Sequence, residues 1–198
     1  MEQQVVQGVQ ETSFFLFAYE SIKYILSKNI EQKEQKTQIE ELGYHLGERA
    51  ANFLMTTKSF EQTQTIKSNE QTQTIKSNEQ TQASQINIEL EKIMKFLAKE
   101  VWIFISGSPM QKLRKNSRGA FILELDDIKL HSCLMTEKGN VKDDKLKCIF
   151  WFLTGVIKGV VNSFNYECTV TYDINPLADQ KETFSYTFSI QILNLNIK

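Results

Sequence analysis

Two glycines four residues apart, inside a predicted helix, constrain how this chain can fold. They are Gly43 and Gly47, in the stretch GYHLGERA. Each glycine costs a helix interior roughly 0.5–1 kcal/mol relative to alanine, so a missing side chain should bring a compensating gain. Residues four apart share one helix face, and Ala50 and Ala51 continue it with small side chains. The strip therefore predicts that another helix packs closely here.

The helix that carries this strip is predicted over residues 39–57, and another helix precedes it. The earlier segment, TSFFLFAYESIKYILSK, begins with the capping residues Thr12 and Ser13 and continues without a helix breaker to Lys28. Its apolar residues cover more than one face. Such a helix has to be buried on more than one face, which predicts contact with a partner as well as with the core of the same chain.

A nine-residue repeat interrupts the helical pattern. EQTQTIKSN occupies residues 61–69, recurs over 70–78, and begins a third time at Glu79. Each copy has only one aliphatic residue, too little apolar surface to offset the loss of chain entropy. We therefore predict one domain over residues 1–198, with residues 59–85 a disordered or loosely extended loop between two helices. A docking motif presented twice is the alternative.

The second half of the chain alternates between helix and strand patterns. SQINIELEKIMKFLAKEVWIFISGSP predicts a third helix, and AFILEL and IKLHSCL predict a hairpin that turns at Asp126-Asp127. A fourth helix is expected from Asp143 or Asp144, followed by two alternating strands over residues 166–172 and 184–192. The predicted class is α+β in the order α-α-α-β-β-α-β-β, with the helices packed on a small antiparallel sheet.

Composition and charge exclude several classes of protein. The net charge of −1 gives no reason to expect nucleic acid as a partner. Three widely spaced cysteines do not suggest a disulfide framework, which favours a cytoplasmic location. The start MEQQVVQGVQET lacks the pattern of a signal peptide. The apolar stretch at residues 148–164 is shorter than the ~20 residues of a membrane span and contains Lys158.

Motifs for catalysis or metal binding are not evident. The chain has no GxxxxGK[ST] phosphate loop, no GxSxG elbow and no CxxC pair. His131 and Cys133 would share a strand face but have no further ligands or orienting acid nearby. We therefore expect no enzyme, no metal and no cofactor. The basic stretch KLRKNSR predicts a solvated loop, or alternatively a surface for an acidic protein or a phosphoinositide-rich membrane.

Three stretches carry recognisable motifs in order along the chain. IEELGYHLGERAANFL contains a Leu-Gly-Tyr-x-x-Gly-x-Arg signature at residues 42–49. IMKFLAKEVWIFISGSPMQKLRKNSRGAFIL contains Lys-Phe-Leu…Lys…Trp, Leu-Arg-x-Asn and Gly-x-ψ-x-Leu steps, and FLTGVIKGVVNSF contains Gly155 and Gly159. Together they resemble the small subunits of TRAPP, the vesicle-tethering complex, and the second stretch resembles the subunit 6 type most. This resemblance covers nearly the whole chain apart from the repeat and the ends.

The resemblance implies a non-catalytic adaptor of mixed α/β fold. It would pair with a sibling subunit of the subunit 3 type and join other TRAPP subunits, which act as an exchange factor for a Rab GTPase in ER-to-Golgi and Golgi transport. Membrane association would be peripheral and through the complex. Pairing through the first two helices would use Phe14, Phe15, Ala18, Tyr19, Ile22, Ile25, Leu42, Gly43, Leu46, Gly47, Ala50, Ala51 and Leu54. The resemblance also implies which helix packs on the glycine strip: the first helix of this chain or a helix of the sibling subunit.

Two further implications limit what is transferred from the resemblance. The central subunit type of this family carries an acyl chain on a cysteine, and no corresponding cysteine occurs in the first three predicted helices, so acylation is not expected here. A small-molecule or lipid-binding domain of the same general fold remains the alternative function, because the helix–sheet interior could hold an apolar ligand. A stoichiometric adduct in native mass spectrometry would favour that alternative.

Overall fold

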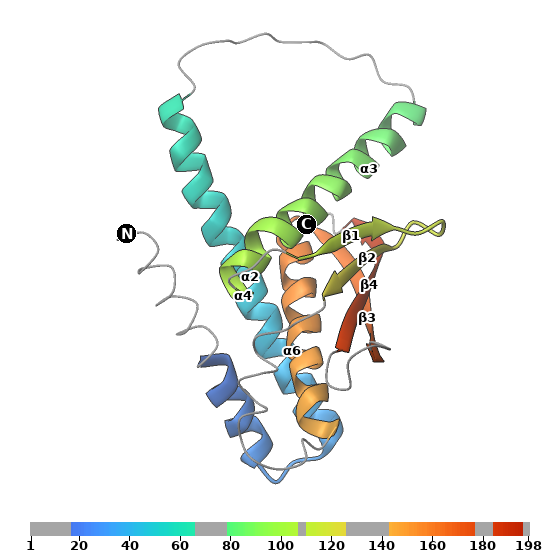
Figure 1. Ribbon diagram of the computed structural model, residues 1–198. Coiled ribbons are helices and arrows are strands. Elements are labelled where there is room, and N and C mark those ends of the chain that lie inside the picture. Colours follow the sequence, from blue (N-terminus) through green and yellow to red (C-terminus); the bar gives the residue numbers. More distant parts are fainter. Residues whose placement is uncertain (1–16, 66–78, 107–109, 126–142, 177–183, 196–198) are drawn as a thin grey trace.

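A central helix lies between a long helix and a four-stranded antiparallel sheet in the computed structural model (Figure 1). The structure describes residues 17–65, 79–106, 110–125, 143–176 and 184–195. After a first helix over residues 17–27, the elements are α2 (Gln32–Thr65), α3 (Glu79–Phe96), the π-helical turn η1 (Leu97–Val101), α4 (Trp102–Ser106), β1 (Lys112–Lys115), β2 (Phe121–Leu125), α6 (Asp143–Asn162), β3 (Tyr166–Pro176) and β4 (Phe184–Leu195). The predicted α+β class, with helices packed on a small antiparallel sheet, is confirmed.

The central helix is α6, and its sequence explains its position. From Cys148 to Val161 every residue except Lys158 is buried. The predicted apolar face packs as expected, but the opposite face is covered as well, because α2 lies along it. A helix that is apolar nearly all round is stable only when both sides are covered.

The sheet has the strand order β1-β2-β4-β3, with all neighbours antiparallel. The alternation predicted for the last two strands is confirmed, since Tyr186, Phe188 and Ile190 are buried and the residues between them are not. The ring of Phe150 in α6 stacks on that of Tyr172 in β3, with centroids 4.7 Å apart. These aromatic contacts attach α6 to the inner face of the sheet.

The first hairpin differs from the predicted one. AFILEL pairs with the preceding basic stretch, so that Lys115 is opposite Phe121, and IKLHSCL lies outside the described residues together with Asp126-Asp127. The turn forms because the Asn116 side-chain oxygen accepts the backbone N–H groups of Arg118 and Ala120, at 3.0 and 2.9 Å. Gly119 supplies the positive φ of 82° that such a turn requires. The basic stretch is therefore largely a strand and not only a solvated loop.

Two predicted helices have different bounds in the structure. α2 continues past Thr57 to Thr65, and α3 begins at Glu79, so the outer parts of the predicted repeat loop are helical. Glutamate and glutamine favour helix, and neither end contains a breaker that would stop it. The predicted third helix is also interrupted, because η1 breaks the α-helical hydrogen bonding. The Ala98 carbonyl in η1 accepts the N–H of Met110, at 3.0 Å, and so connects this turn to the segment before β1.

Candidate partner interface

The glycines of α2 lie directly against the backbone of α6. A Cβ added to Gly43 would overlap the carbonyl oxygen of Phe152 and lie 3.1 Å from the Val156 nitrogen. A Cβ on Gly47 would overlap the Val156 carbonyl oxygen in the same way. No side chain could be accommodated at either position without moving one helix, because the obstructing atoms belong to the backbone.

The contact is reciprocal, since α6 contributes two glycines of its own. A Cβ on Gly155 would overlap the carbonyl oxygen of Glu40, and one on Gly159 that of Tyr44. The four glycines therefore let the two helices cross at backbone contact. The prediction that a helix packs on the strip is confirmed. The predicted choice between the first helix and a partner's helix was wrong, because the strip packs on α6 of the same chain.

Polar contacts at the margin of this crossing reinforce its register. The Lys158 ammonium donates to a carboxylate oxygen of Glu40 at 3.3 Å, and Lys36 lies 3.7 Å from the other oxygen. Both groups remain partly exposed, so each pair contributes at most about 1 kcal/mol. The crossing is therefore held mainly by close backbone packing.

The first helix presents one covered and one open face. Ala18, Ile22 and Ile25 follow helical spacing and are buried. On another side Phe17 and Tyr24, seven residues apart, are 56% and 65% exposed. Two large aromatic side chains of this exposure on one helix are unusual for a fully assembled surface.

The predicted interface residues fall into three groups. Phe14 and Phe15 lie outside the described residues. The half-buried residues are Tyr19, Leu42, Leu46 and Leu54. The residues buried within the chain are Ala18, Ile22, Ile25, Gly43, Gly47, Ala50 and Ala51. The assignment of these residues to a partner interface stays a prediction.

Three aromatic residues of this region were missing from the predicted set. Besides Phe17 and Tyr24, Phe53 of α2 is 54% exposed, and its ring lies 5.8 Å from that of Phe104 in α4. In the sequence they cannot be distinguished from the buried apolar residues of the same helices. Exposure, which separates a core residue from a surface one, depends on where α6 and α4 pack.

The remaining chemistry-bearing residues have ordinary surroundings. His45 is exposed, 4.0 Å from the carboxylates of Glu41 and Glu48, whereas His131 and Cys133 lie outside the described residues. In the part of the chain that the structure describes, no three histidine, cysteine or acidic side chains gather as metal ligands would. Likewise, none of the described helices is both long and apolar enough to cross a bilayer.

Cys168 in β3 is expected to resist alkylation in the folded protein. Burial raises the pKa of its thiol from 9.0 to about 12, so at pH 8 only about one thiol in ten thousand would be the reactive thiolate. Iodoacetamide at pH 8 should modify Cys168 only after unfolding in urea, as read by peptide mass mapping. Native-state labelling as fast as in urea would contradict the buried position.

The same pKa shift predicts the sign of a pH effect. Above pH 9 the unfolded thiol loses its proton while the folded one keeps it until about pH 12. The native state then binds more protons than the unfolded state, so the contribution of Cys168 to stability falls as the pH rises through this window. The contribution is constant below the unfolded pKa.

Comparison with known proteins identifies the fold and the family. The sequence model of the transport protein particle (TRAPP) component family matches residues 14–193, nearly the whole chain. The chain belongs to the TRAPP component family. The match includes both glycine-bearing helices and the four strands of the sheet, except for the last two residues of β4.

Two individual proteins similar to this TRAPP-family chain add detail. A crystal structure of trafficking protein particle complex subunit 3 from Naegleria fowleri, covalently bound to palmitic acid, aligns with a TM-score of 0.63. At 16% identity it covers 94% of this chain and 99% of its own, and it shows the fold. An uncharacterized protein of Schizosaccharomyces pombe is 29% identical over 82 residues. The match spans 41% of this chain and about a third (32%) of that relative.

Proposed function

We propose that this TRAPP-family chain is a non-catalytic structural subunit that pairs with a sibling small subunit of the subunit 3 type. The contact would use the helix over residues 17–27 and the adjoining side of α2. The observation that carries the proposal is the exposure of three aromatic side chains, Phe17 and Tyr24 on the first helix and Phe53 on α2. Exposed aromatic residues have apolar surface that a partner can cover, and they are the usual anchors of protein interfaces.

The glycine crossing supports this arrangement indirectly. Because Gly43 and Gly47 fix α2 against α6, the outward side of α2 is held on a rigid base. A preformed surface loses little freedom on binding and therefore binds more tightly than a flexible one. Leu42 and Leu46 of α2 are half-buried, and pairing on this side of α2 would cover them fully.

The proposed wider role rests on membership of the TRAPP component family. Within a TRAPP complex the subunit would support assembly of a Rab GTPase exchange factor that acts in ER-to-Golgi and Golgi transport. Its location would be cytoplasmic, and its attachment to Golgi and ER–Golgi intermediate membranes peripheral. The subunit 6 type is the proposed variant, on the basis of the stretch from Lys95 to Leu123 that resembles it.

Co-purification tests the proposal. The tagged full chain, expressed in its native cell, should recover other TRAPP components when isolated at low salt. Mixed with a sibling of the subunit 3 type, it should elute from a size-exclusion column as a one-to-one complex at micromolar concentration. Elution as two separate species, together with recovery of no TRAPP component, would refute the proposed role.

A further inference from the structure

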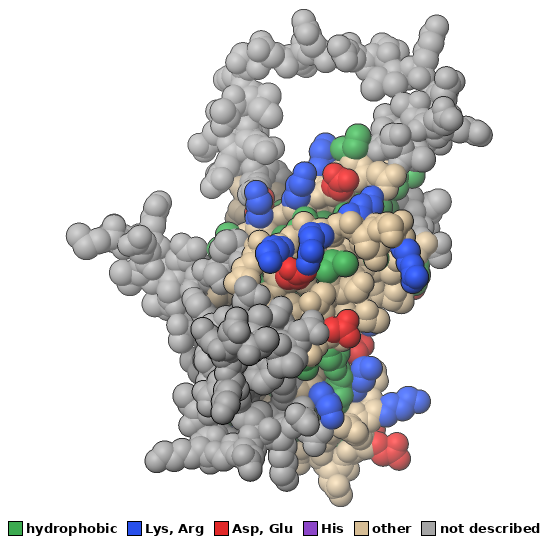
Figure 2. Space-filling view, turned by 45° about the vertical axis from the view of Figure 1, so that its right-hand side comes forward, with side chains coloured by type: hydrophobic (Ala, Val, Ile, Leu, Met, Phe, Trp, Pro, Cys, Tyr) green, Lys and Arg blue, Asp and Glu red, His purple; other side chains and the backbone are tan. Residues whose placement is uncertain are grey.

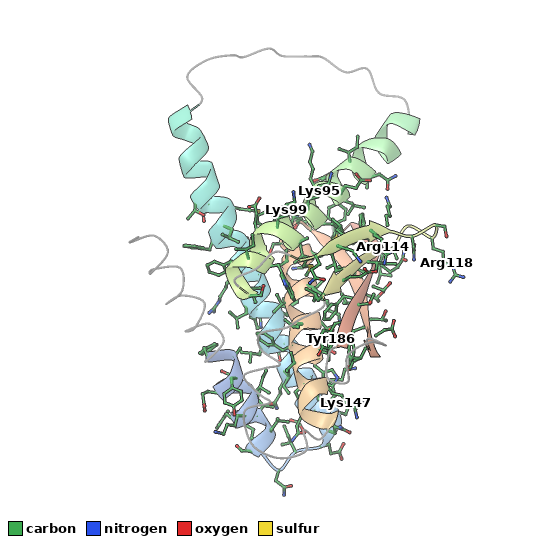
Figure 3. The ribbon with its side chains drawn as sticks, in the orientation of Figure 1. Lys95, Lys99, Arg114, Arg118, Lys147 and Tyr186 are labelled. Carbon is green, nitrogen blue, oxygen red and sulfur yellow. The ribbon has the colours of Figure 1, made fainter. Side chains whose placement is uncertain are left out.

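The two edge strands of the sheet are protected from further pairing to different degrees. β1 has only four residues, and three of them, Lys112, Arg114 and Lys115, are basic. Figure 2 shows Lys and Arg side chains gathered where α3 and the β1–β2 hairpin lie, and Figure 3 labels Arg114 and Arg118 on that hairpin. Short length and basic side chains are usual means by which proteins keep an edge strand from pairing with another chain.

β3, at the other edge of the sheet, lacks these protections. It has 11 residues, contains no lysine or arginine, and has its one proline, Pro176, at its end. Its register with β4 shifts between Glu167 and Cys168, and the ladder is regular from Cys168 onward. Within the described residues, no backbone hydrogen bond joins β3 to any segment other than β4. Along this part of the chain, the outward N–H and C=O groups of β3 can therefore pair with an added strand.

The inner face of the sheet is less well covered at the β3 edge than at β4. Figure 3 shows Tyr186 of β4 between the sheet and α6, where it is 2% exposed and its ring lies 5.2 Å from that of Phe150. On β3, by contrast, Val170, Tyr172 and Ile174 are only half-buried. An added strand would bring apolar side chains beside these three and complete their burial.

The outer face of β3 is acidic. Glu167 and Asp173 are exposed, with the exposed neutral side chains of Thr169 and Thr171 between them. In the described part of the chain, neither carboxylate has a basic side chain within ion-pair distance. Their positions are about 20 Å apart along the strand. Basic side chains on the same face of an added strand would therefore meet unpaired negative charge.

A second copy of this chain does not suit this edge. Pairing of β3 with β3 about a two-fold axis at Val170 would put Glu167 of each copy opposite Asp173 of the other. Like charges directly opposite one another are destabilising. β1 of a second copy is basic but has only four residues, and Glu124 already holds its outward charges.

We propose that the free edge of β3 binds an extended segment of another protein in which basic residues alternate with apolar ones. The segment would add a strand to the sheet, with backbone hydrogen bonds supplying affinity and the alternating side chains supplying specificity. Its apolar side chains would cover Val170, Tyr172 and Ile174. Its basic side chains would face Glu167 and Asp173.

This edge is separate from the proposed contact with the sibling subunit. α6 lies between the sheet and α2, so the edge of β3 and the helices that would pair with the sibling belong to different layers (Figure 1). One subunit could therefore hold both partners at the same time, and either contact can be tested without the other.

Fluorescence anisotropy with a labelled peptide tests the proposal on the full chain. The probe is a capped peptide of about seven residues that alternates lysine and valine, long enough to reach from Glu167 to Asp173. It should bind, whereas the same peptide with glutamate in place of lysine should not. N-methylation of the backbone nitrogens removes the donors but keeps the charges and side chains, so it should abolish binding. Hydrogen exchange should show new protection in β3, and none in β1, when the lysine peptide is bound.

Charge reversal at the edge gives a matched pair of variants. E167K/D173K should weaken binding of the lysine peptide roughly tenfold and allow the glutamate peptide to bind, because attractive cross-strand pairs become repulsive. E31K/E91K makes the same change in net charge at exposed carboxylates just before α2 and in α3, and should bind the lysine peptide like the native chain. Circular dichroism checks that both variants are folded.

Several results would overturn the proposal. Absence of binding would show that the edge does not accept an added strand. Equal binding of the N-methylated peptide would show attraction between charges without strand addition, and equal weakening in the two double variants would place the contact elsewhere. Protection of β3 that rises with protein concentration in the absence of peptide would assign the edge to a second copy of the chain.

Discussion

Replacing Gly155 by alanine is expected to lower the free energy of unfolding by about 3 kcal/mol or more. The new Cβ would overlap the carbonyl oxygen of Glu40 and lie 2.9 Å from the backbone nitrogen of Tyr44. Neither atom belongs to a flexible side chain, so α2 and α6 would have to separate along the crossing. Urea unfolding followed by circular dichroism measures the loss, and G47A on the opposite helix should show a similar one.

The matched control for this experiment is Gly119→Ala in the β1–β2 turn. A Cβ there would meet nothing within 4 Å, although φ is +82°. The substitution should therefore cost only the penalty of a left-handed conformation, about 1–2 kcal/mol. If G155A were no more costly than G119A, the close approach of α2 and α6 would be refuted. This comparison is needed because any glycine-to-alanine change also stiffens the unfolded chain.

Tyr24→Asp and Phe53→Asp are each expected to weaken pairing with the sibling subunit by about 2 kcal/mol or more, a thirtyfold loss of affinity. A charge in the middle of an apolar contact loses its hydration without gaining a partner. Both side chains are more than half exposed in the single chain, so the fold should tolerate the change. Isothermal titration with the sibling subunit gives the affinity, and thermal unfolding gives the stability.

Ile88→Asp is the control for those two variants, because Ile88 is as exposed as Phe53 but lies on α3. It should leave the affinity for the sibling unchanged. If all three substitutions weakened pairing alike, the contact would not be confined to the first helix and α2. If none did, the exposed aromatic side chains would serve another purpose and the proposed pairing mode would be wrong.

The glycine spacing shows what sequence alone could and could not establish. It required a helix at backbone distance from α2, and the structure contains one. The choice of helix was missed, although GVIKG in α6 has glycines at the same four-residue spacing as GYHLG in α2. α2 and α6 each need a neighbouring helix that has glycines at the crossing, and each provides these glycines for the other. Matching the two spacings would have identified the pair.

The hairpin was missed for a different reason. AFILEL has a pairing edge on both sides, and periodicity does not distinguish a partner before it in the chain from one after it. The decisive signal was the turn chemistry of Asn116 and Gly119, which closes the loop on the upstream side. The exposure of Phe17 and Tyr24 could not be predicted from the sequence, because exposure is set by the packing of segments that are distant in the chain.

The α2–α6 crossing also determines when the chain can fold. Lys158 and Glu40, which meet at its margin, are 118 residues apart in the sequence. During synthesis α2 would leave the ribosome long before α6 is made, so Gly43 and Gly47 would have no helix to pack against. A contact of such long range is made late, so the rigid surface offered to a partner is completed only when most of the chain has been made. A chain in which α6 has not yet been made would therefore pair poorly with a partner. Assembly should follow the synthesis of α6.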